Sequence, residues 1–490
     1  VSQLRLQFEL EPGERLFLNR LVVNRKIPFT PSLLRIVLLF IGGLCLFLLL
    51  KAPVFLRQAM PDDFGQRLIT TFTAAFIVIL CFWLAIASAS EPFFAVSETG
   101  GDFYSRDFAD ALRRGRFDLL ITPPQELAES ANPYDPALRE AIVSSDLIED
   151  AAYYNGRYYV PYGIVPALLL FAPFRQLYGY TFQTIWAVTL FGAFAMLLLY
   201  LNIRRLLLIY FPHLAFRWHY VAGLSTCAAS FIGWGLTSPG YENMSRLGGL
   251  FFVLMASNQL LYLVYGRQGL PRRSLIREAV LETQADIPSI ERSDRIAPVS
   301  SPLPENDTLN HVGRISCGRL LLTGLFIMLA IGCHPVQAII LLPYTLVFFL
   351  LIKRAYKNKQ LFPALVCFIL PVLIGGFLLG SYNQARFGSV FEFGGRFRLT
   401  FADLRFTTIN LARLFPGLGQ HLLTPPIISP VFPFIHFPAG AAFMPATFFP
   451  YDGRTIGLVT LPFLLILPLF PLQKKLRVYL CRATSTQQGV

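Results

Sequence analysis

The sequence predicts an all-α polytopic membrane protein, a bundle of about eight or nine transmembrane helices with interfacial helices in a large first extracytoplasmic loop. Hydrophobic residues make up 54% of the 490 residues and charged residues only 14%, about half the charged share of a soluble domain. The sequence contains uncharged apolar runs, and each of them is long enough to cross about 30 Å of hydrocarbon as a helix. Six windows of 18 to 23 residues lack any charge: residues 68–90, 184–203, 218–239, 247–265, 361–382 and 455–472.

The basic residues orient these spans. The net charge is +13, but the positive side chains lie mostly in short segments between apolar runs, so we expect membrane topology and no nucleic acid to explain them. Four groups mark the cytoplasmic side: Arg204, Arg205 and Arg217; Arg267, Arg272, Arg273 and Arg277; Lys353, Arg354, Lys357 and Lys359; and Lys474, Lys475 and Arg477. The two large loops, residues 91–183 and 382–454, then share the outer face.

The chain divides by this topology into eight parts. A tail with a short apolar segment (1–67) precedes the first core span (68–90), the first extracytoplasmic loop (91–183), three spans (184–266), a polar cytoplasmic linker (267–319), a helical hairpin with the following span (320–381), the second extracytoplasmic loop (382–454), and the last span with a cytoplasmic tail (455–490). The segment 36–50 suits a span or a re-entrant helix. The linker has the composition of a flexible segment, with a docking segment as the alternative.

The apolar stretch 320–352 is too long for one crossing and has His334-Pro335 near its middle. Because proline interrupts a helix, we expect a hairpin with this dipeptide at its tip. His334 then lies near the outer surface, where an ionisable residue in an apolar setting suggests a function.

The first outer loop begins with an amphipathic pattern after Gly100-Gly101. Apolar residues recur at helical spacing from Asp102 onward, which predicts a helix on the membrane surface. Asp102 is either the N-cap of this helix or a general base at the membrane boundary. Further acids that could assist are Glu98, Asp107 and Glu242.

Aromatic residues follow in the same loop. Asn155-Gly156, between tyrosine pairs that include Tyr158, predicts a β-hairpin. These tyrosines suit either interfacial anchors or a platform for stacking a sugar. The apolar, proline-containing segment 160–177 is expected to be a second surface helix.

The second outer loop begins with several arginines, although the positive-inside rule disfavours basic residues on the outer face. Because a guanidinium pairs well with phosphate oxygens, these arginines suggest an anionic ligand, and the alternative is contact with lipid headgroups. The candidate residues of this segment are Arg386, Arg396 and Arg398 with Tyr382, Asn383 and Glu392. His421 and His436 are too far apart for a metal-ligand pattern, so no metal site is predicted.

The order of these features resembles the GT-C membrane glycosyltransferases over residues 68–472. The shared plan is a span, an outer Asp that opens an amphipathic helix (Asp102), a Pro-rich segment ending in Leu177-Tyr178-Gly179, and a span ending in Arg204-Arg205. Closest in plan are protein O-mannosyltransferases, lipid A aminoarabinose transferases and bacterial relatives of unassigned substrate, in which RFGSVFEFGGRF is similar to a loop. Many members have Asp-Glu where this chain has Asp102-Phe103.

The resemblance implies inverting transfer of a hexosyl or pentosyl group from a polyprenyl-phosphate carrier to a glycan, lipid or protein acceptor outside the cytoplasm. Asp102 would act on the acceptor hydroxyl, and Arg386, Arg396 or Arg398 would neutralise the departing phosphate. It places the protein among the lipids of a bacterial cytoplasmic membrane, part of the cell envelope, and leaves a divalent cation open as a cofactor. The rival is a transporter or flippase for a lipid-linked sugar. Transport predicts ionisable residues within the spans, where almost none occur, so an enzyme is favoured.

Overall fold

The computed structural model describes residues 33–60, 63–89, 93, 102–142, 146–211, 214–265, 316–339, 344–346, 361–400, 402–406, 427–428 and 435–436. Contacts divide the chain into two compact units, Val1–Leu56 and Arg57–Val490. In the first, α1 (Leu33–Lys51) is followed by the single turn α2 (Pro53–Leu56). A helix therefore covers the apolar segment 36–50.

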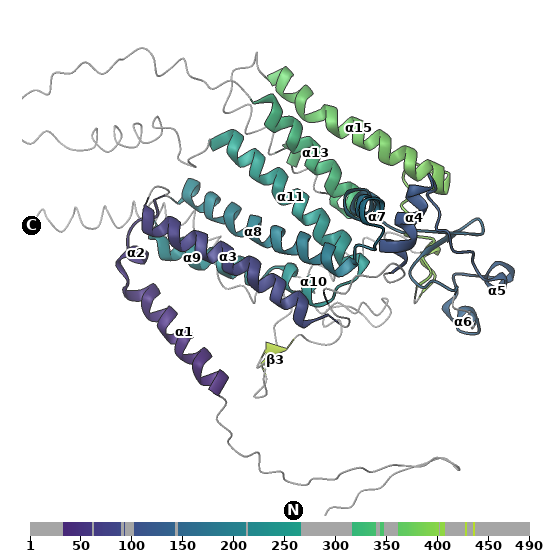
Figure 1. Cartoon of the computed structure of the whole chain (residues 1–490). Helices are drawn as coiled ribbons and strands as arrows, with labels where there is room; N and C mark the ends of the chain where they lie inside the picture. The colour runs from purple at the N-terminus through teal and green to yellow at the C-terminus, as the bar shows by residue number, and fades with distance from the viewer. Residues whose placement is uncertain are drawn as a thin grey trace, which may run out of the picture. The chain divides into compact units, whose positions relative to one another are not determined.

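Among the described residues of the second unit, four helices are long and apolar enough to cross a membrane. They are α3 (Phe64–Ala87), α8 (Thr184–Tyr210), α11 (Tyr241–Tyr265) and α15 (Leu361–Phe387). The shorter apolar helix α13 (Cys317–Cys333) lies between α11 and α15, so that the order across the bundle is α3, α8, α11, α13, α15 (Figure 1). These apolar helices indicate a membrane protein. The window 455–472 lies outside the described residues.

The window 218–239 is not one continuous helix. It divides into α9 (Phe216–Ala228) and α10 (Phe231–Thr237). Ser230 has the extended backbone of an N-cap, and its hydroxyl donates to the Cys227 carbonyl at 2.7 Å. The apolar composition did not predict this break, because a single serine hardly changes the hydropathy of the window and can also lie inside a helix.

The break expected at His334-Pro335 is confirmed. α13 ends at Cys333, His334 is extended (φ −147°, ψ 119°), and the 3₁₀ turn η3 (Pro335–Gln337) follows. Most of the second arm of the predicted hairpin lies outside the described residues.

Two helices extend beyond the windows that predicted them. α11 starts at Tyr241, so Glu242 lies in its first turn and not in a connecting loop. α15 ends at Phe387, so Tyr382, Asn383 and Arg386 belong to its last turns and not to the second loop. These polar residues are thus fixed to helix ends.

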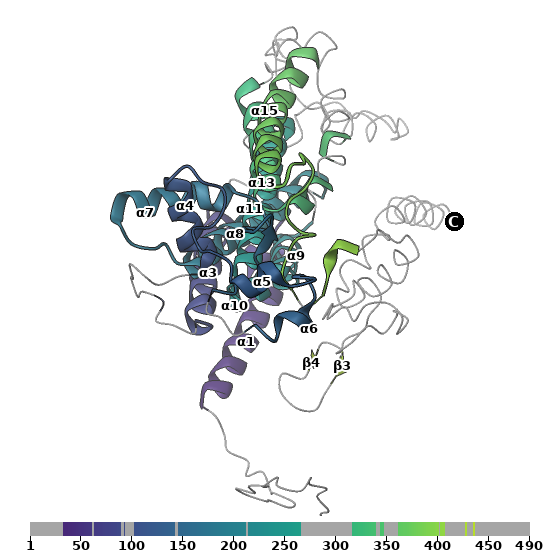
Figure 2. The same cartoon turned by 90° about the vertical axis from the view of Figure 1, so that its right-hand side faces the viewer.

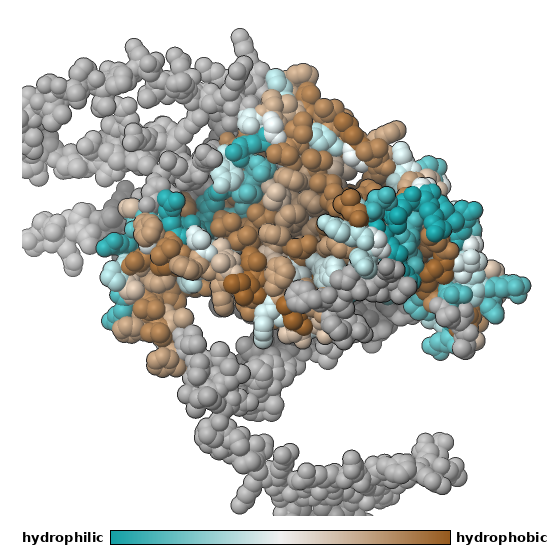
Figure 3. All heavy atoms as spheres, in the orientation of Figure 1, coloured by the Kyte–Doolittle hydropathy of each residue, from teal (hydrophilic) through white to brown (hydrophobic). Residues whose placement is uncertain are grey.

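The first loop folds into a compact layer at one end of the bundle (Figures 1 and 2). Its helical elements are the short π-helix η1 (Phe103–Asp107), α4 (Phe108–Arg113), α5 (Gln125–Glu129), α6 (Pro136–Arg139), the short π-helix η2 (Ala167–Phe171) and α7 (Ala172–Tyr178). Fully buried side chains, among them Tyr104, Phe108 and Phe171, form its core. Figure 3 shows hydrophilic residues gathered at this end and hydrophobic residues over the helices.

The Asn-Gly hairpin is confirmed. β1 (Ala152–Tyr154) pairs antiparallel with β2 (Arg157–Tyr159). Asn155 and Gly156 have φ of 49° and 73°, the left-handed pair that a two-residue type I′ turn requires.

The second loop joins this hairpin along β1. Tyr153 N donates to Phe397 O at 2.8 Å, and Leu399 N donates to Ala151 O at 2.9 Å. Residues 397–399 thus form a third strand-like segment. The two predicted outer loops are therefore in direct backbone contact. The remaining described elements of the second loop are the 3₁₀ turn η5 (Leu404–Phe406) and the paired β3 (Ile427–Ile428) and β4 (Ile435–His436).

Candidate functional site

Arg398 lies at the centre of a polar cluster built from both loops and from α11. Its Nη2 is 2.7 Å from Asp150 Oδ1, and its Nη1 is 2.6 Å from Glu242 Oε1. The Tyr162 hydroxyl accepts from Arg398 Nη1 and donates to Glu242 Oε1, both at 2.8 Å. Arg246, one turn beyond Glu242, bonds its Oε2 at 3.1 Å. We call these five residues the Arg398 cluster.

The backbone around Asp150 explains how the cluster forms. Asp150 has φ of 67°, a left-handed conformation that aspartate tolerates better than most residues. Its N–H donates to Leu399 O at 2.7 Å, and its carbonyl accepts from the Tyr241 hydroxyl at 3.3 Å. Strand pairing between the loops therefore holds Asp150 against Arg398.

A cavity of about 280 Å³ adjoins the cluster. This volume lies just below the roughly 300–1,000 Å³ of drug-sized sites, so it suits a small polar group. Its walls come from α10, the start of α11 and both loops: Asp150, Trp234, Ser238, Pro239, Gly240, Tyr241, Glu242, Asn243 and Arg398. Two carboxylates and a guanidinium thus face one small space.

The electrostatics of the cluster favour a permanent charge on Arg398. Burial lowers its pKa, but Tyr162, Tyr241, Glu242 and Asp150 raise it, and the net shift is upward. Burial is the main cause that raises the pKa of Tyr162, so its hydroxyl keeps its proton at neutral pH. The cluster therefore contains a charged Arg398 beside a neutral phenol.

His334 joins this cluster through Tyr162. The two rings stack with centroids 5.0 Å apart. Burial, helped by the charge of Arg246, lowers the pKa of His334 to about 4, although Glu242 opposes the shift. The imidazole is consequently neutral at pH 7. The cluster and the adjacent His334 therefore bring together three of the residues predicted from sequence: Arg398, Glu242 and His334.

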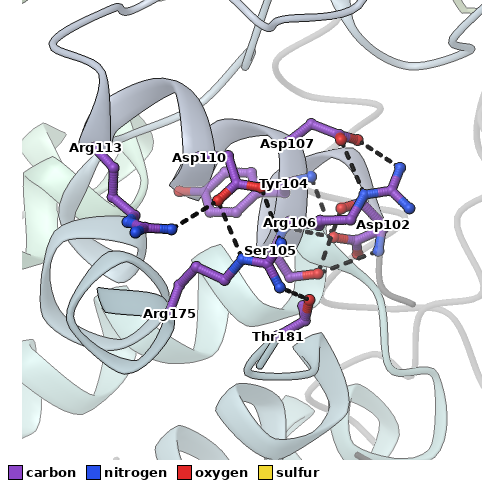
Figure 4. Close-up of polar contacts among 9 residues, drawn as sticks. All are labelled: Asp102, Tyr104, Ser105, Arg106, Asp107, Asp110, Arg113, Arg175 and Thr181. Atoms are coloured by element: carbon purple, nitrogen blue, oxygen red, sulfur yellow. Dashed lines mark hydrogen bonds and ion pairs between the residues drawn. The ribbon is translucent and has the colours of Figure 1, made fainter. Parts of the chain in front are cut away.

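Asp102 is the N-cap that its sequence context predicted (Figure 4). Its Oδ1 accepts from the backbone N–H groups of Tyr104 at 3.1 Å and Ser105 at 2.7 Å. Its Oδ2 accepts from the Thr184 hydroxyl at 2.8 Å, which ties the first loop to the start of α8. Both carboxylate oxygens are thus engaged, and its role as a base stays a prediction.

The other acids near Asp102 differ in their surroundings. Asp107 pairs with its neighbour Arg106, with Nε to Oδ1 at 2.9 Å. Glu98 lies outside the described residues. A helical segment does begin after Asp102, as η1 and α4, but Phe108 and Ala111 of its apolar face are fully buried inside the protein. Phe103 packs on Tyr241 with ring centroids 5.1 Å apart. Asp102 and Glu242 are therefore on neighbouring elements.

Arg386 fastens α15 to the first loop. It is only 3% exposed, and its Nη1 donates to Val160 O at 2.7 Å. Its Nη2 donates to Asn383 Oδ1 at 2.8 Å, and its guanidinium lies 3.8 Å from the Tyr382 ring centroid. Asn383 in turn donates to Val390 O at 3.1 Å. This burial makes Arg398 a better candidate than Arg386 for contact with a ligand.

The remaining candidates of the second loop are more peripheral. Arg396 is exposed. Glu392 Oε1 accepts from Gly394 N at 2.8 Å, which stabilises the turn before residue 397. Glu392 thus shapes the loop that carries Arg398.

The tyrosines of the hairpin do not form a surface platform. Tyr158 is fully buried, and Tyr153 and Tyr159 are 7% and 8% exposed. Burial raises the pKa of Tyr158 to about 12. Neither interpretation from the sequence fits these three side chains, because they pack inside the first loop, where no sugar or lipid reaches them. The second surface helix over 160–177 is shorter than predicted and comprises η2 and α7.

Sequence reasoning missed Asp150, Tyr162 and Arg246. Arg246 follows Glu242 by four residues, a spacing typical of helical ion pairs, so it could have been found. Nothing local marked Asp150 or Tyr162, since their partners are distant in sequence. Within the described part of the chain, no group of three or more His, Cys, Asp or Glu side chains could hold a metal ion.

Comparison with known proteins gives no relative: no protein-family model, curated protein or solved structure matches this chain.

Proposed function

We propose that this protein is a membrane glycosyltransferase that moves a sugar from a polyprenyl-phosphate carrier to an extracytoplasmic glycan, lipid or protein acceptor, with inversion, at the Arg398 cluster. One observation carries the proposal. Residues 397–399 pair with β1, and this pairing holds Arg398 between Asp150 and Glu242 beside a small cavity at the end of the apolar helices. Acid, guanidinium and lipid-facing helices thus meet in one place.

The donor phosphate would bind to the arginines. A carrier lipid keeps its tail beside the apolar helices, and its phosphate reaches their ends. Arg246 is 40% exposed, its Nη2 bonds Glu242 and its Nη1 reaches Asn243 Oδ1 at 3.4 Å. A guanidinium carries five N–H donors, so further N–H groups can meet a phosphate oxygen. Arg398, held by two carboxylates, stabilises the negative charge that develops on the departing phosphate.

The acceptor would be activated by a carboxylate. Its hydroxyl oxygen attacks the anomeric carbon while the bond from that carbon to the phosphate oxygen breaks, and the carboxylate takes the hydroxyl proton. Glu242 lines the cavity and Asp102 does not, which favours Glu242 over Asp102 for this step. Asp102, the base implied by the family resemblance, would then hold the first loop against α8.

The proposed setting is the cytoplasmic membrane of a bacterium, with the cluster on the extracytoplasmic face. The distribution of basic residues supports this orientation, because Arg204, Arg205 and Arg217 lie near the end of α8 that is opposite to Thr184. Thr184 contacts the first loop through Asp102. The loop layer therefore lies on the side away from these arginines.

The experiment uses purified protein with a radiolabelled polyprenyl-phosphate sugar and a membrane extract as the source of acceptor. Wild type should release sugar from the carrier, and Arg398→Gln should not. The control is Arg157→Gln, which removes an arginine that is 63% exposed in the hairpin. Absence of turnover together with movement of the labelled lipid across vesicles would instead support the flippase.

A further inference from the structure

A second polar group lies between α4 and α7, outside the Arg398 cluster (Figure 4). It borders a cavity of about 360 Å³ lined by Asp110, Arg113, Arg114, Arg175 and Gln176. Three guanidinium groups and one carboxylate face this space, so its charge is positive. We call it the α4–α7 groove.

Asp110 and Arg175 form the fixed side of the groove. Arg175 Nε and Nη2 bond the two oxygens of Asp110, each at 3.1 Å, and Nη1 donates to Gly179 O at 2.9 Å. This bidentate pair cancels one positive charge and joins α4 to α7. The positive charges of Arg113 and Arg114 are thus left over once the Asp110 carboxylate has neutralised Arg175.

Arg113 and Arg114 are the accessible side of the groove. Arg113 is 38% exposed, donates from Nε to Gln176 at 2.8 Å and reaches Asp110 only at 3.3 Å. Arg114 is the C-cap of α4 and is exposed. Their guanidinium groups can therefore bind a ligand without breaking the Asp110–Arg175 pair.

Apolar side chains are exposed on α7 and on η2, which leads directly into α7. Leu168 and Leu169 of η2 are 50% and 47% exposed, and Leu177 and Tyr178 of α7 are 76% and 63% exposed. Figure 3 shows hydrophobic residues near α7 beside the hydrophilic residues over α4. Leucines beside arginines are typical of a segment that lies at the boundary between headgroups and acyl chains.

We infer that the α4–α7 groove binds the headgroup of an anionic phospholipid of the surrounding bilayer, with its phosphate at Arg113 and Arg114 and its acyl chains against Leu168, Leu169 and Leu177. Charge complementarity supports an anionic headgroup, and the adjacent leucines support a lipid over a free anion. The inference rests on the membrane location and uses no residue of the proposed transfer site.

The test is lipid retention measured by native mass spectrometry of full-length protein in detergent with equal amounts of phosphatidylglycerol and phosphatidylcholine. Wild type should retain phosphatidylglycerol in preference. Arg113→Gln/Arg114→Gln should lower this preference roughly fivefold or more, since one basic residue near an anionic surface contributes about that factor. Arg157→Gln, which removes an exposed arginine outside the groove, should behave as wild type.

Three results would overturn the inference. The first is that the double variant retains phosphatidylglycerol as wild type does. The second is that Arg157→Gln loses phosphatidylglycerol as much as the double variant, which would show that the net charge of the protein, and not the groove, sets the preference. Displacement of the lipid by millimolar inorganic phosphate would assign the groove to a free anion. A thermal unfolding midpoint equal to that of Arg157→Gln shows that the double variant is folded. Arg114→Gln alone is a milder second variant, because it removes no hydrogen bond to Asp110.

Discussion

Arg398 and Asp150 are 248 residues apart in the sequence, yet Nη2 of the arginine lies 2.7 Å from Oδ1 of the aspartate. The same guanidinium contacts Glu242 of α11. One side chain thus connects the two loops to a membrane helix.

Replacing Arg398 by glutamine should destabilise the protein by about 2 kcal/mol, because the two carboxylates would lose their shared cation while both stay partly exposed to water. The thermal unfolding midpoint in detergent would fall. Arg157→Gln, which removes an exposed arginine, should change it little. An unchanged midpoint in Arg398→Gln would show that the ion pairs do not hold the loops together.

Asp102 can be tested as a cap separately from any role in chemistry. Asparagine caps helices about as well as aspartate, so Asp102→Asn should keep the stability within about 0.5 kcal/mol. Asp102→Ala should cost about 1–2 kcal/mol, since the N–H groups of Tyr104 and Ser105 lose their acceptor. Chemical unfolding curves measure both. Equal stability of the alanine variant and wild type would remove the capping role.

Gly163 should not tolerate a side chain. A Cβ at this position would overlap the carbonyl of Gly332 in α13, so the first loop or the helix must shift. Gly163→Ala should cost about 3 kcal/mol or more. Gly318→Ala is the matched control, because no atom lies within 4 Å of its added Cβ. Similar unfolding midpoints for the two variants would contradict this packing.

His334 should make stability depend on pH. Its folded pKa of about 4 lies below the usual 6.5, so the unfolded chain binds the proton first. Stability is therefore highest above pH 6.5 and falls as the pH drops toward 4, by up to about 3 kcal/mol. His334→Gln should remove this part of the dependence. If both proteins lost stability in parallel between pH 6.5 and 4, the buried imidazole would not be responsible.

Local sequence patterns predicted much of the fold. Uncharged windows located the long helices, and Asn155-Gly156 located the hairpin, because helix length and a type I′ turn depend on neighbouring residues. The break at Ser230 was missed, since hydropathy averages over a window and does not report where a serine ends a helix.

The candidate site was harder to predict. Arg398 and Glu242 were named from their charge and position, but Arg398 was not distinguished from Arg386. The difference arises from burial: Arg386 lies under Tyr382 and bonds the Val160 carbonyl. Such contacts depend on how α15 meets the first loop. No local sequence pattern predicts this contact between α15 and the first loop. Asp150 and Tyr162 were not predicted for the same reason, because their partners are distant in the sequence.

Catalysis by Glu242 is tested most directly by the rate at which Glu242→Gln releases sugar from a polyprenyl-phosphate donor, compared with the rate of Arg157→Gln. Glutamine keeps the size of Glu242 and one oxygen that can accept from Tyr162 and Arg398. Its amide nitrogen cannot accept the bond from Arg246, and glutamine cannot take a proton. We expect a rate at least about 100-fold lower in Glu242→Gln, measured at a temperature at which both variants are folded. Equal rates for the two variants would contradict catalysis by Glu242 at the Arg398 cluster.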